Sequence, residues 1–383
     1  MVPKLRFKEF CGEWDLKLLK DITEKIGDGL HGTPKYDENG EYFFINGNNI
    51  RNGKIIVLEE NKKVGEDEFI KNDKGLDFDT VLMSINGTIG NLAYYNNEKV
   101  FLGKSVAYIK VSDEIKKQYL FQVLQTNFIQ KYYTLSLTGT TIKNLGLDAI
   151  RNTKIKLPSL PEQTKIADFL STVDDKIQNQ QDKITHLENI KKGFMQKIFS
   201  RKIRFKDDGG EEFPEWEEKK LGDISKITTG NSNVDEKIEN GKYRFFDRGL
   251  DSINYLNEYF LDEEAIIYPG EGSKFMPRYY NGKFALHQRC YAIYGVLNGI
   301  NVKYLFYYMQ TLNKYFLRTS VGTTVPSLRQ SNFEKCKILL PSEREQQKIA
   351  NFLSSFDKKI STEKETLEHL KQLKKGLLQQ MFV

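Results

Sequence analysis

Amide, hydroxyl and basic side chains concentrate in turn-rich segments of both halves of this 383-residue chain. Arg, Lys, Asn and Gln can form paired hydrogen bonds with a base edge, whereas Ser and Thr bind phosphates or bases. Any one of these residues alone is more often a solvated loop side chain. Two diverged sets in one chain, however, favour two recognition surfaces of different specificity.

The candidate DNA contacts form one set in each half. In the first half they are His31, Lys35, Asn48, Asn49, Arg51, Asn86, Thr88, Thr140, Thr141, Lys143 and Asn144. In the second half they are Arg244, Arg248, Ser273, Lys274, Arg278, Gln288, Arg289, Thr323, Thr324, Arg329 and Gln330.

The residue spacings that catalysis requires are not visible in the sequence. An amino-methyltransferase needs an N/D-P-P-Y/F loop, but the nine prolines are never adjacent. His287 and Cys290 have an HxxC spacing without the second pair that a zinc site needs. The stretch GEGSK, at Gly270 to Lys274, lacks the G-x-x-x-x-G-K spacing of a phosphate loop, and we interpret it as a turn between strands. We therefore expect no catalytic residue, metal or cofactor in this chain.

Composition narrows the class of protein only weakly. The net charge of +6 is a mild basic excess that is compatible with nucleic acid and common among other proteins. Three scattered cysteines fit free thiols in a reducing cytoplasm. The sequence has no apolar run of about 18 residues and no secretory h-region, so we expect no membrane span.

A long internal repeat organises the chain. Residues 157–177 and 340–360 share 14 of 21 positions without a gap, at an offset of 183. This register extends from Gly139 to Phe199, whereas upstream only anchors such as Arg6-Phe7-Lys8 and Arg204-Phe205-Lys206 correspond. The chain is therefore a tandem duplication in which each half has a variable part followed by a nearly constant part.

Each constant part is predicted to be a helix of roughly forty residues. Ser159 with Glu162, and Ser342 with Glu345, have the spacing of a capping box at a helix start. Apolar residues then recur at spacings of four and three, which is a heptad pattern interrupted at Gln180 and Glu363 and at Lys191 and Lys374. The predicted seam residues are Ile166, Leu170, Val173, Ile177, Ile184, Leu187, Phe194, Ile198, Ile349, Leu353, Phe356, Ile360, Leu367, Leu370, Leu377 and Met381.

Two arrangements of these helices are open. Each helix could pack on its own globular neighbour, or the two could pair with each other. Two similar heptad helices in one chain favour pairing, and an antiparallel pair would put one globular part at each end of a rod.

The variable parts are predicted to be mixed α and β. Strand-like runs cover Tyr42 to Ile50, Thr80 to Asn91 and Ser105 to Val111, with a helix from Lys116 to Tyr133. The second half repeats this order and has a helix from Val302 to Arg318. The expected fold is α+β, with two mixed domains and two long antiparallel coiled-coil helices in a pseudo-two-fold duplication.

The two-copy pattern resembles the specificity subunit of type I restriction–modification systems. Each half opens R-F-x…W…L-x-D-I, has a G-T-T turn, continues E-Q-x-K-I-A-x-F-L-S and ends in a helix containing K-K-G. The two copies of the motif differ at some aligned positions. The first copy has Pro161 and Thr164 where the second has Arg344 and Gln347, so partner contacts can differ between the copies.

The resemblance implies a division of the chain into four parts. Residues 1–157 and 201–340 would be target recognition domains for the two halves of a bipartite DNA site. Residues 158–200 and 341–383 would be helices that set the unread spacer and dock two methyltransferase subunits. ATP-dependent translocase–nuclease subunits would complete the larger complex, and methyl donor, ATP and Mg²⁺ would belong to the partners.

Three functions follow as hypotheses. The leading one is a non-catalytic subunit that gives the complex its DNA specificity. The second is a methyltransferase or nuclease with an unrecognised site. The third is a coiled-coil scaffold that does not contact DNA.

Overall fold

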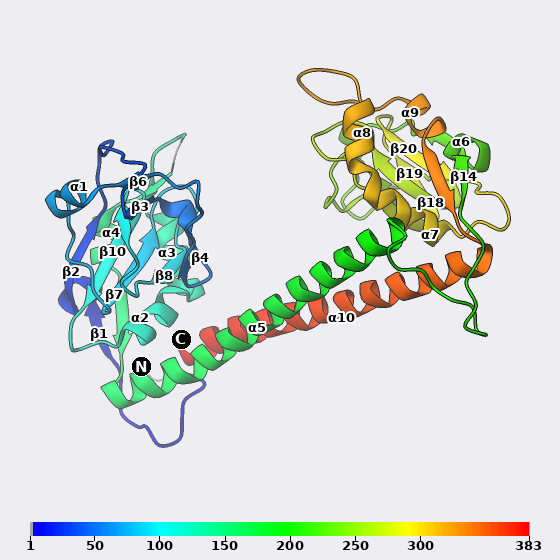
Figure 1. The fold of residues 1–383 in the computed structure, drawn as a ribbon. Helices are drawn as coiled ribbons and strands as arrows, with labels where there is room; N and C mark the ends of the chain where they lie inside the picture. Colours follow the sequence, from blue (N-terminus) through cyan, green and yellow to red (C-terminus); the bar gives the residue numbers. More distant parts are fainter. Residues whose placement is uncertain (1–2, 142, 383) are drawn as a thin grey trace. The chain divides into compact units, whose positions relative to one another are not determined.

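The computed structural model describes residues 3–141 and 143–382, which form two compact units (Figure 1). Unit 1 contains Met1–Gln181 and Glu365–Val383, and unit 2 contains Asp182–Lys364. Unit 1 is therefore discontinuous in sequence, because its last segment follows the whole of unit 2. Within the described residues, no helix is long and apolar enough to cross a membrane.

Unit 1 is built around a four-stranded antiparallel sheet in the order β2-β10-β7-β8. A second, three-stranded sheet has the order β6-β3-β9, with β3 parallel to β9. The pairs β1-β13, β4-β5 and β11-β12 complete its strands. The strands are β1 Asp15–Leu18, β2 Thr23–Asp28, β3 Tyr42–Ile45, β4 Ile50–Arg51, β5 Lys54–Ile55, β6 Lys63–Val64, β7 Thr80–Ser84, β8 Leu92–Tyr94, β9 Val100–Leu102, β10 Val106–Val111, β11 Leu137–Thr138, β12 Asn144–Leu145 and β13 Lys154–Leu157.

Unit 2 repeats this plan in one six-stranded sheet of order β15-β20-β18-β19-β16-β17. Strands β16 and β19 are parallel, as β3 and β9 are in unit 1, and β14 pairs with β21 as β1 pairs with β13. The duplication in the sequence is therefore also a duplication of topology. The strands are β14 Glu217–Lys220, β15 Lys226–Thr229, β16 Tyr243–Phe246, β17 Asn254–Leu256, β18 Leu261–Pro269, β19 Arg278–Leu286, β20 Cys290–Tyr294 and β21 Lys337–Leu340.

The helix predicted in each variable part is broken into shorter segments. The first is split at Gln125 and Thr126, because Thr126 has an extended backbone (ψ 143°) that starts a new helix. The second contains a 3-10 turn, η4, Gln310–Leu312. The α-helices of the variable parts are α1 Glu66–Lys71, α2 Lys117–Leu124, α3 Asn127–Leu135, α4 Leu147–Arg151, α6 Leu221–Ile224, α7 Val302–Met309, α8 Asn313–Thr319 and α9 Gln330–Glu334, and the other 3-10 turns are η1 Leu19–Asp21, η2 Gly47–Asn49 and η3 Val234–Glu236.

The two constant parts form the long helices α5, Leu160–Phe199, and α10, Glu343–Met381. In unit 2, Lys183 pairs with Glu363 (2.6 Å) and Lys191 with Asp357 (2.5 Å), so residue numbers fall along α10 as they rise along α5. In unit 1, Lys374 binds Asp174 at 2.6 Å, which is the same ion pair shifted by the repeat offset. The helices are thus antiparallel partners, and the lysines that interrupt the heptad pattern form ion pairs between them.

The seam residues lie at the helix pair or in the globular cores. Five are half-buried (Ile177, Phe194, Phe356, Leu370 and Leu377), and the other eleven are buried. Ile166 and Leu170 belong to the core of unit 1 together with Met381 from the end of α10. Ile349 and Leu353 belong to the core of unit 2 together with Ile198 from the end of α5. Both expected arrangements therefore occur, since each helix pairs with the other and also packs on a globular part.

The expected capping boxes are not formed as predicted. The Glu162 carboxylate accepts hydrogen bonds from Arg6 Nε (2.7 Å) and Nη2 (2.8 Å), and Glu345 accepts from Arg204 Nε (3.3 Å) and Nη2 (3.0 Å). Ser342 Oγ accepts from the Glu345 N–H at 3.4 Å, which is half of a box. A buried carboxylate binds a guanidinium in preference to a backbone amide because the ion pair compensates its charge. Through these ion pairs the glutamates hold the segment with the R-F-K motif against the start of each long helix.

The glutamine of each E-Q motif ties the long helix to the globular part. Gln163 Oε1 accepts the Lys116 N–H at 2.8 Å, and its amide donates to the carbonyls of Glu114 and Pro158. Gln346 Oε1 accepts the Asn301 N–H at 2.9 Å in the same way. Both glutamines are buried, so the repeated motif has a structural role that is identical in the two units.

Candidate nucleic-acid interface

In unit 2, three loops bring two arginines onto one carboxylate. Arg248 follows β16, Glu271 follows β18, and Arg289 lies between β19 and β20. Arg248 Nη1 donates to Glu271 Oε2 at 3.1 Å, and Arg289 Nη1 donates to Glu271 Oε1 at 2.7 Å. Burial opposes ionisation of Glu271, but the two guanidinium groups outweigh it and lower the pKa of this carboxyl. The ion pair is therefore ionised at neutral pH.

A further loop, which carries the second G-T-T turn, docks beside this cluster. Glu271 forms a backbone bridge with Ser327, and the Leu328 N–H donates to the Gly270 carbonyl at 2.7 Å. Thr323 and Thr324 lie in this loop and are exposed. The structure therefore brings candidate residues from four loops to one edge of unit 2.

Unit 1 has the same loop arrangement with different side chains. Asn86 bridges Asn144 as Glu271 bridges Ser327, and the Leu145 N–H donates to the Ile85 carbonyl at 2.9 Å. Asn86 Oδ1 is buried and has no hydrogen-bond partner among the described residues. The turn after β7 in unit 1 therefore corresponds to the turn after β18 in unit 2.

The positions of the two arginines also have counterparts in unit 1. Ser105 precedes β10 as Arg289 precedes β20, and Gly47 is the second residue after β3 as Arg248 is after β16. Ser105 Oγ accepts the Gly47 N–H at 2.8 Å, so this part of unit 1 is held by small polar groups. At these two positions unit 1 therefore has a glycine and a serine that bond to each other, whereas unit 2 has two partly exposed guanidinium groups.

Most of the other candidate residues are exposed, and some of the exposed ones also bond within their own unit. The exposed ones are His31, Lys35, Asn48, Arg51, Thr88, Thr140, Thr141, Lys143, Ser273, Lys274, Gln288, Arg329 and Gln330. Those whose side chains bond within their own unit are His31 with Asp28, Arg51 with Asn48, Thr88 with Gly47, Arg244 with Ser252, Gln288 with Asn233 and Gln330 with Glu334.

Two candidates are structural. Asn49 Nδ2 donates to the Ile56 carbonyl, and its Oδ1 accepts the Asn46 N–H. Arg278 donates to the carbonyls of Gly249 and Asp247, and burial lowers its pKa. We leave Asn49 and Arg278 out of the interface, because their donors are used to hold loops.

Sequence reasoning missed the role of Glu271, which lies within GEGSK. An acidic residue between basic candidates is not expected on a DNA surface, so residue type gave no reason to select Glu271. The repeat did give a reason, because the turn with Glu271 corresponds to the turn with the candidate Asn86 in the first half.

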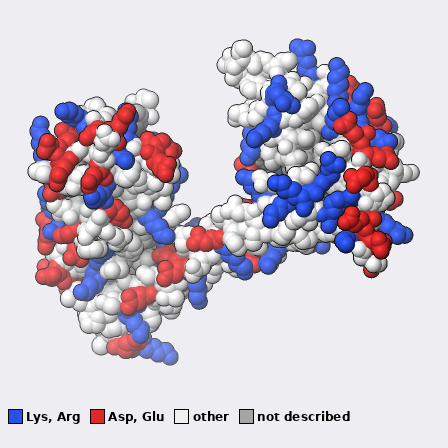
Figure 2. All heavy atoms as spheres, viewed as in Figure 1, with Lys and Arg blue, Asp and Glu red and all other residues white. Residues whose placement is uncertain are grey.

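Charge is unevenly distributed on the visible face of unit 2. In Figure 2, Lys and Arg side chains gather over a broad area of this unit, and Asp and Glu lie mainly along another side. The face of unit 1 in the same view mixes both signs. A basic area of this kind raises the local concentration of polyanions and speeds their association.

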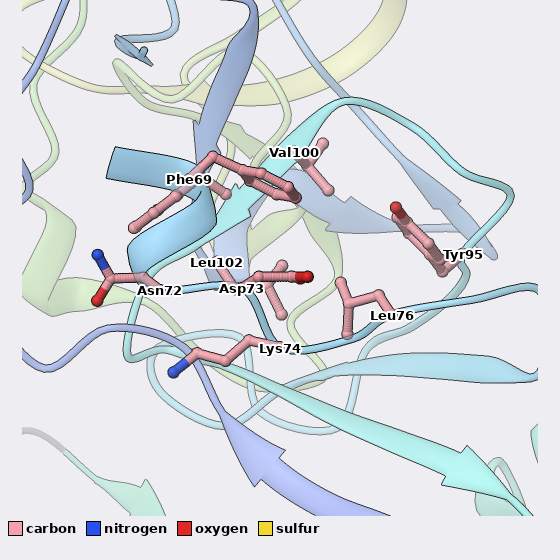
Figure 3. A pocket seen from close by; sticks show the side chains of 9 residues that line it. Phe69, Asn72, Asp73, Lys74, Leu76, Tyr95, Val100 and Leu102 are labelled. Carbon is pink, nitrogen blue, oxygen red and sulfur yellow. The ribbon is translucent and has the colours of Figure 1, made fainter. Parts of the chain in front are cut away.

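A small cavity in unit 1 lies beside α1 (Figure 3). Its volume is about 120 Å³, and the rings of Phe69 and Tyr95 form part of its lining with Leu76 and Val100. Ligand sites usually measure about 300 to 1,000 Å³, so we assign no ligand to it. Among the described residues, no group of three or more His, Cys, Asp or Glu could hold a metal.

The family model described as the type I restriction modification DNA specificity domain matches the chain twice, at residues 12–189 and 214–372. The chain belongs to this family. The family is that of DNA-specificity components, so the alternative of a methyltransferase or nuclease with an unrecognised site is not favoured.

Relatives and solved structures agree with membership of the specificity family. The chain is 26% identical to the type I restriction enzyme MjaIX specificity subunit of Methanocaldococcus jannaschii, over 96% of this chain and 92% of that protein. It is 29% identical to the EcoDI specificity subunit of Escherichia coli over 43% of this chain and 36% of that protein. The crystal structure of a type I S subunit from M. genitalium has the same fold, with a TM-score of 0.61 at 20% identity over 100% of this chain and 99% of that one.

Proposed function

We propose that each unit of this specificity subunit reads one half of a bipartite DNA site. The observation that supports this proposal is the comparison of the two loop clusters. Both units have corresponding strands, the same Arg–Glu ion pair and the same glutamine contacts. Their loops differ, because unit 1 has Gly47, Asn86 and Ser105 where unit 2 has Arg248, Glu271 and Arg289. A constant frame with different polar loops is what two distinct half-sites require.

We further propose that the long helices set the spacer between the half-sites. Helices α5 and α10 have 40 and 39 residues and contribute to both units. Because the helices pair antiparallel, the number of residues in each helix sets the length of the helix pair. The unread base pairs would then be counted by helix length and not by contacts with DNA.

Two methyltransferase subunits and, in the full complex, ATP-dependent restriction subunits are the proposed partners. The repeated E-Q-x-K-I-A segment gives both units similar helix faces, which suits two copies of one partner. Methyl donor, ATP and Mg²⁺ belong to these partners. Because the target is DNA, we propose that the chain works in the cytoplasm.

Exchange of one recognition domain tests the proposal. Residues 1–157 are replaced by the corresponding domain of another specificity subunit, and methylated sites are mapped in a host that also carries the methyltransferase partner. One half-site should change, while the other half-site and the spacer stay the same. The reciprocal exchange of residues 201–340 is the matched control and should change the other half-site. Methylation without sequence preference, or a change in both half-sites, would contradict the proposal.

Neutralising exposed lysine and arginine in the G-T-T loops separates DNA contact from a scaffold role. Lys143→Ala and Arg329→Ala should each lower the affinity of the complex for all DNA sequences, and each should reduce the slope of log affinity against log salt by about 1. A scaffold without DNA contact would show the same affinity and the same slope as the wild type.

A further inference from the structure

Arg248, Glu271 and Arg289 form a hydrogen-bonded ionic cluster on the loops of unit 2. Each arginine uses one Nη1 atom to reach a different carboxylate oxygen, at 3.1 and 2.7 Å. No other hydrogen bond of either guanidinium group is found within the part of the chain that the structure describes. The side chains of Arg248 and Arg289 are 48% and 58% exposed, so their remaining N–H donors face solvent.

Glu271 is a fixed anchor for these arginines. Its side chain is 19% exposed, and its backbone is held on both sides. The Gly270 N–H donates to the Arg289 carbonyl at 2.8 Å, and Gly272 donates to the Pro326 carbonyl at 3.0 Å. The carboxylate therefore holds two long, otherwise flexible side chains in a fixed direction. Such preorganisation reduces the entropy that each arginine loses when it binds a ligand.

The ligand chemistry follows from the donors that remain. A guanidinium with an exposed N–H pair matches two adjacent acceptors in one plane, and in the major groove guanine presents such a pair at O6 and N7. A phosphate can also accept two hydrogen bonds from a guanidinium, so it is the ion pair with Glu271 that favours a base edge over a phosphate. The carboxylate weakens the attraction of this cluster for phosphates, since the three side chains together carry a net charge of only about +1.

We propose that Arg248 and Arg289 read guanine in the half-site contacted by unit 2, with Glu271 as a positioning residue. This inference rests on the proposed function of unit 2. The corresponding positions in unit 1, Gly47 and Ser105, have no guanidinium, so guanine reading through these positions belongs to one half-site only.

The test uses the complex of the full chain with its methyltransferase partner. Methylation mapping and the exchange of residues 201–340 first identify the half-site of unit 2, which should contain guanine. Duplexes with each guanine of that half-site replaced by another base should then bind about 5- to 150-fold more weakly at the positions read by the arginines. Replacement by 7-deazaguanine removes only the N7 acceptor and should weaken binding at the same positions.

Three variants distinguish base reading from phosphate binding. Arg289→Ala should bind native and 7-deazaguanine duplexes equally at the guanine that Arg289 reads, because that contact with N7 is gone, while 7-deazaguanine at the position read by Arg248 should still weaken binding. Arg289→Lys keeps the charge but loses the planar pair of donors, so it should lose base preference at that position and retain the salt dependence of the wild type. Glu271→Gln removes the anchor charge, and it should relax the guanine preference while binding to unrelated DNA stays equal or increases.

The outcomes separate this inference from the proposed function. If mapped sites are specific but the half-site of unit 2 lacks guanine, or if Arg289→Lys retains the base preference, the inference is wrong and the proposed function stands. If the complex methylates DNA without sequence preference, the proposed function itself is wrong. Circular dichroism and the urea midpoint of each variant exclude loss of the fold as the cause.

Discussion

Substitution of Glu345 tests the structural role assigned to the repeated E-Q motif. Glu345 is fully buried, and its carboxylate accepts hydrogen bonds from Arg204 and from Trp216 Nε1 (3.1 Å). Glu345→Ala removes the buried carboxylate of this group and leaves the Trp216 indole N–H without its acceptor, while Arg204 keeps Glu215 and the carbonyls of Phe213 and Pro214. The free energy of unfolding of unit 2 should therefore fall.

The magnitude follows from the burial of each partner. Breaking a buried ion pair costs about 3 to 5 kcal/mol. Because Arg204 is 19% exposed and also contacts Glu215, water and that carboxylate partly compensate the loss, so the lower end of about 3 kcal/mol applies. Loss of the Trp216 hydrogen bond to a charged acceptor adds about 1.5 kcal/mol. We expect a total of about 4.5 kcal/mol.

Tryptophan fluorescence allows each unit to be measured separately. The chain has two tryptophans, Trp14 in unit 1 and Trp216 in unit 2. Urea unfolding in a Trp14→Phe background therefore reports unit 2 through Trp216. The matched control is Glu345→Gln, which retains an acceptor for the indole N–H and should destabilise unit 2 by clearly less than Glu345→Ala.

The corresponding residue in unit 1 provides a second comparison. Glu162 binds Arg6, but the Trp14 Nε1 atom has no hydrogen-bond partner among the described residues. Glu162→Ala therefore lacks the indole contribution and should cost unit 1 less than Glu345→Ala costs unit 2. A loss below about 1 kcal/mol for Glu345→Ala is the value typical of surface pairs, and it would refute the reasoning.

Three further predictions concern pH, the helix pair and the spacer. The pKa of Glu271 lies below its unfolded value of about 4.5, so its contribution to the stability of unit 2 is complete above that pH and is lost as the pH falls further. Between pH 7 and pH 3 the urea midpoint should therefore fall less in Glu271→Gln than in the wild type. Lys374→Met removes a lysine that is 12% exposed and should cost unit 1 about 2 kcal/mol in urea unfolding, whereas the surface control Lys364→Met should cost unit 2 less than about 0.5 kcal/mol. Insertion of about four residues at both Gln180 and Glu363 adds about 6 Å of helix, so methylation mapping should find a spacer about two base pairs longer with both half-sites unchanged.

The repeat made much of the frame predictable from the sequence. The heptad spacing predicted the two long helices. The strand-like run from Ser105 to Val111 contains β10, whereas in the run from Tyr42 to Ile50 strand β3 ends at Ile45 and a 3-10 turn follows. The repeat also showed that the arginine and glutamate at Arg6 and Glu162 have counterparts in the second half. It did not show that they bind each other, because 156 residues separate them and only the fold brings them together.

The helix breaks and the recognition loops were harder to predict. The apolar pattern of residues 116–133 continues through Gln125 and Thr126, so periodicity alone does not locate the break. Residue type also could not separate Arg278, whose guanidinium holds two loop carbonyls, from Arg289, whose guanidinium is largely exposed. The role of each arginine depends on which carbonyls and carboxylates the fold places beside it.

The discontinuity of unit 1 has a consequence for how the chain folds during synthesis. Leu378, Met381 and Phe382 lie in the core of unit 1, and Phe382 packs on Trp14 with ring centroids 6.3 Å apart. Domains generally fold in the order in which the ribosome releases them. Here unit 2, Asp182–Lys364, is released complete while unit 1 still lacks part of its core. The domain that is translated first is therefore completed last, and until then it exposes the apolar surface that the end of α10 covers.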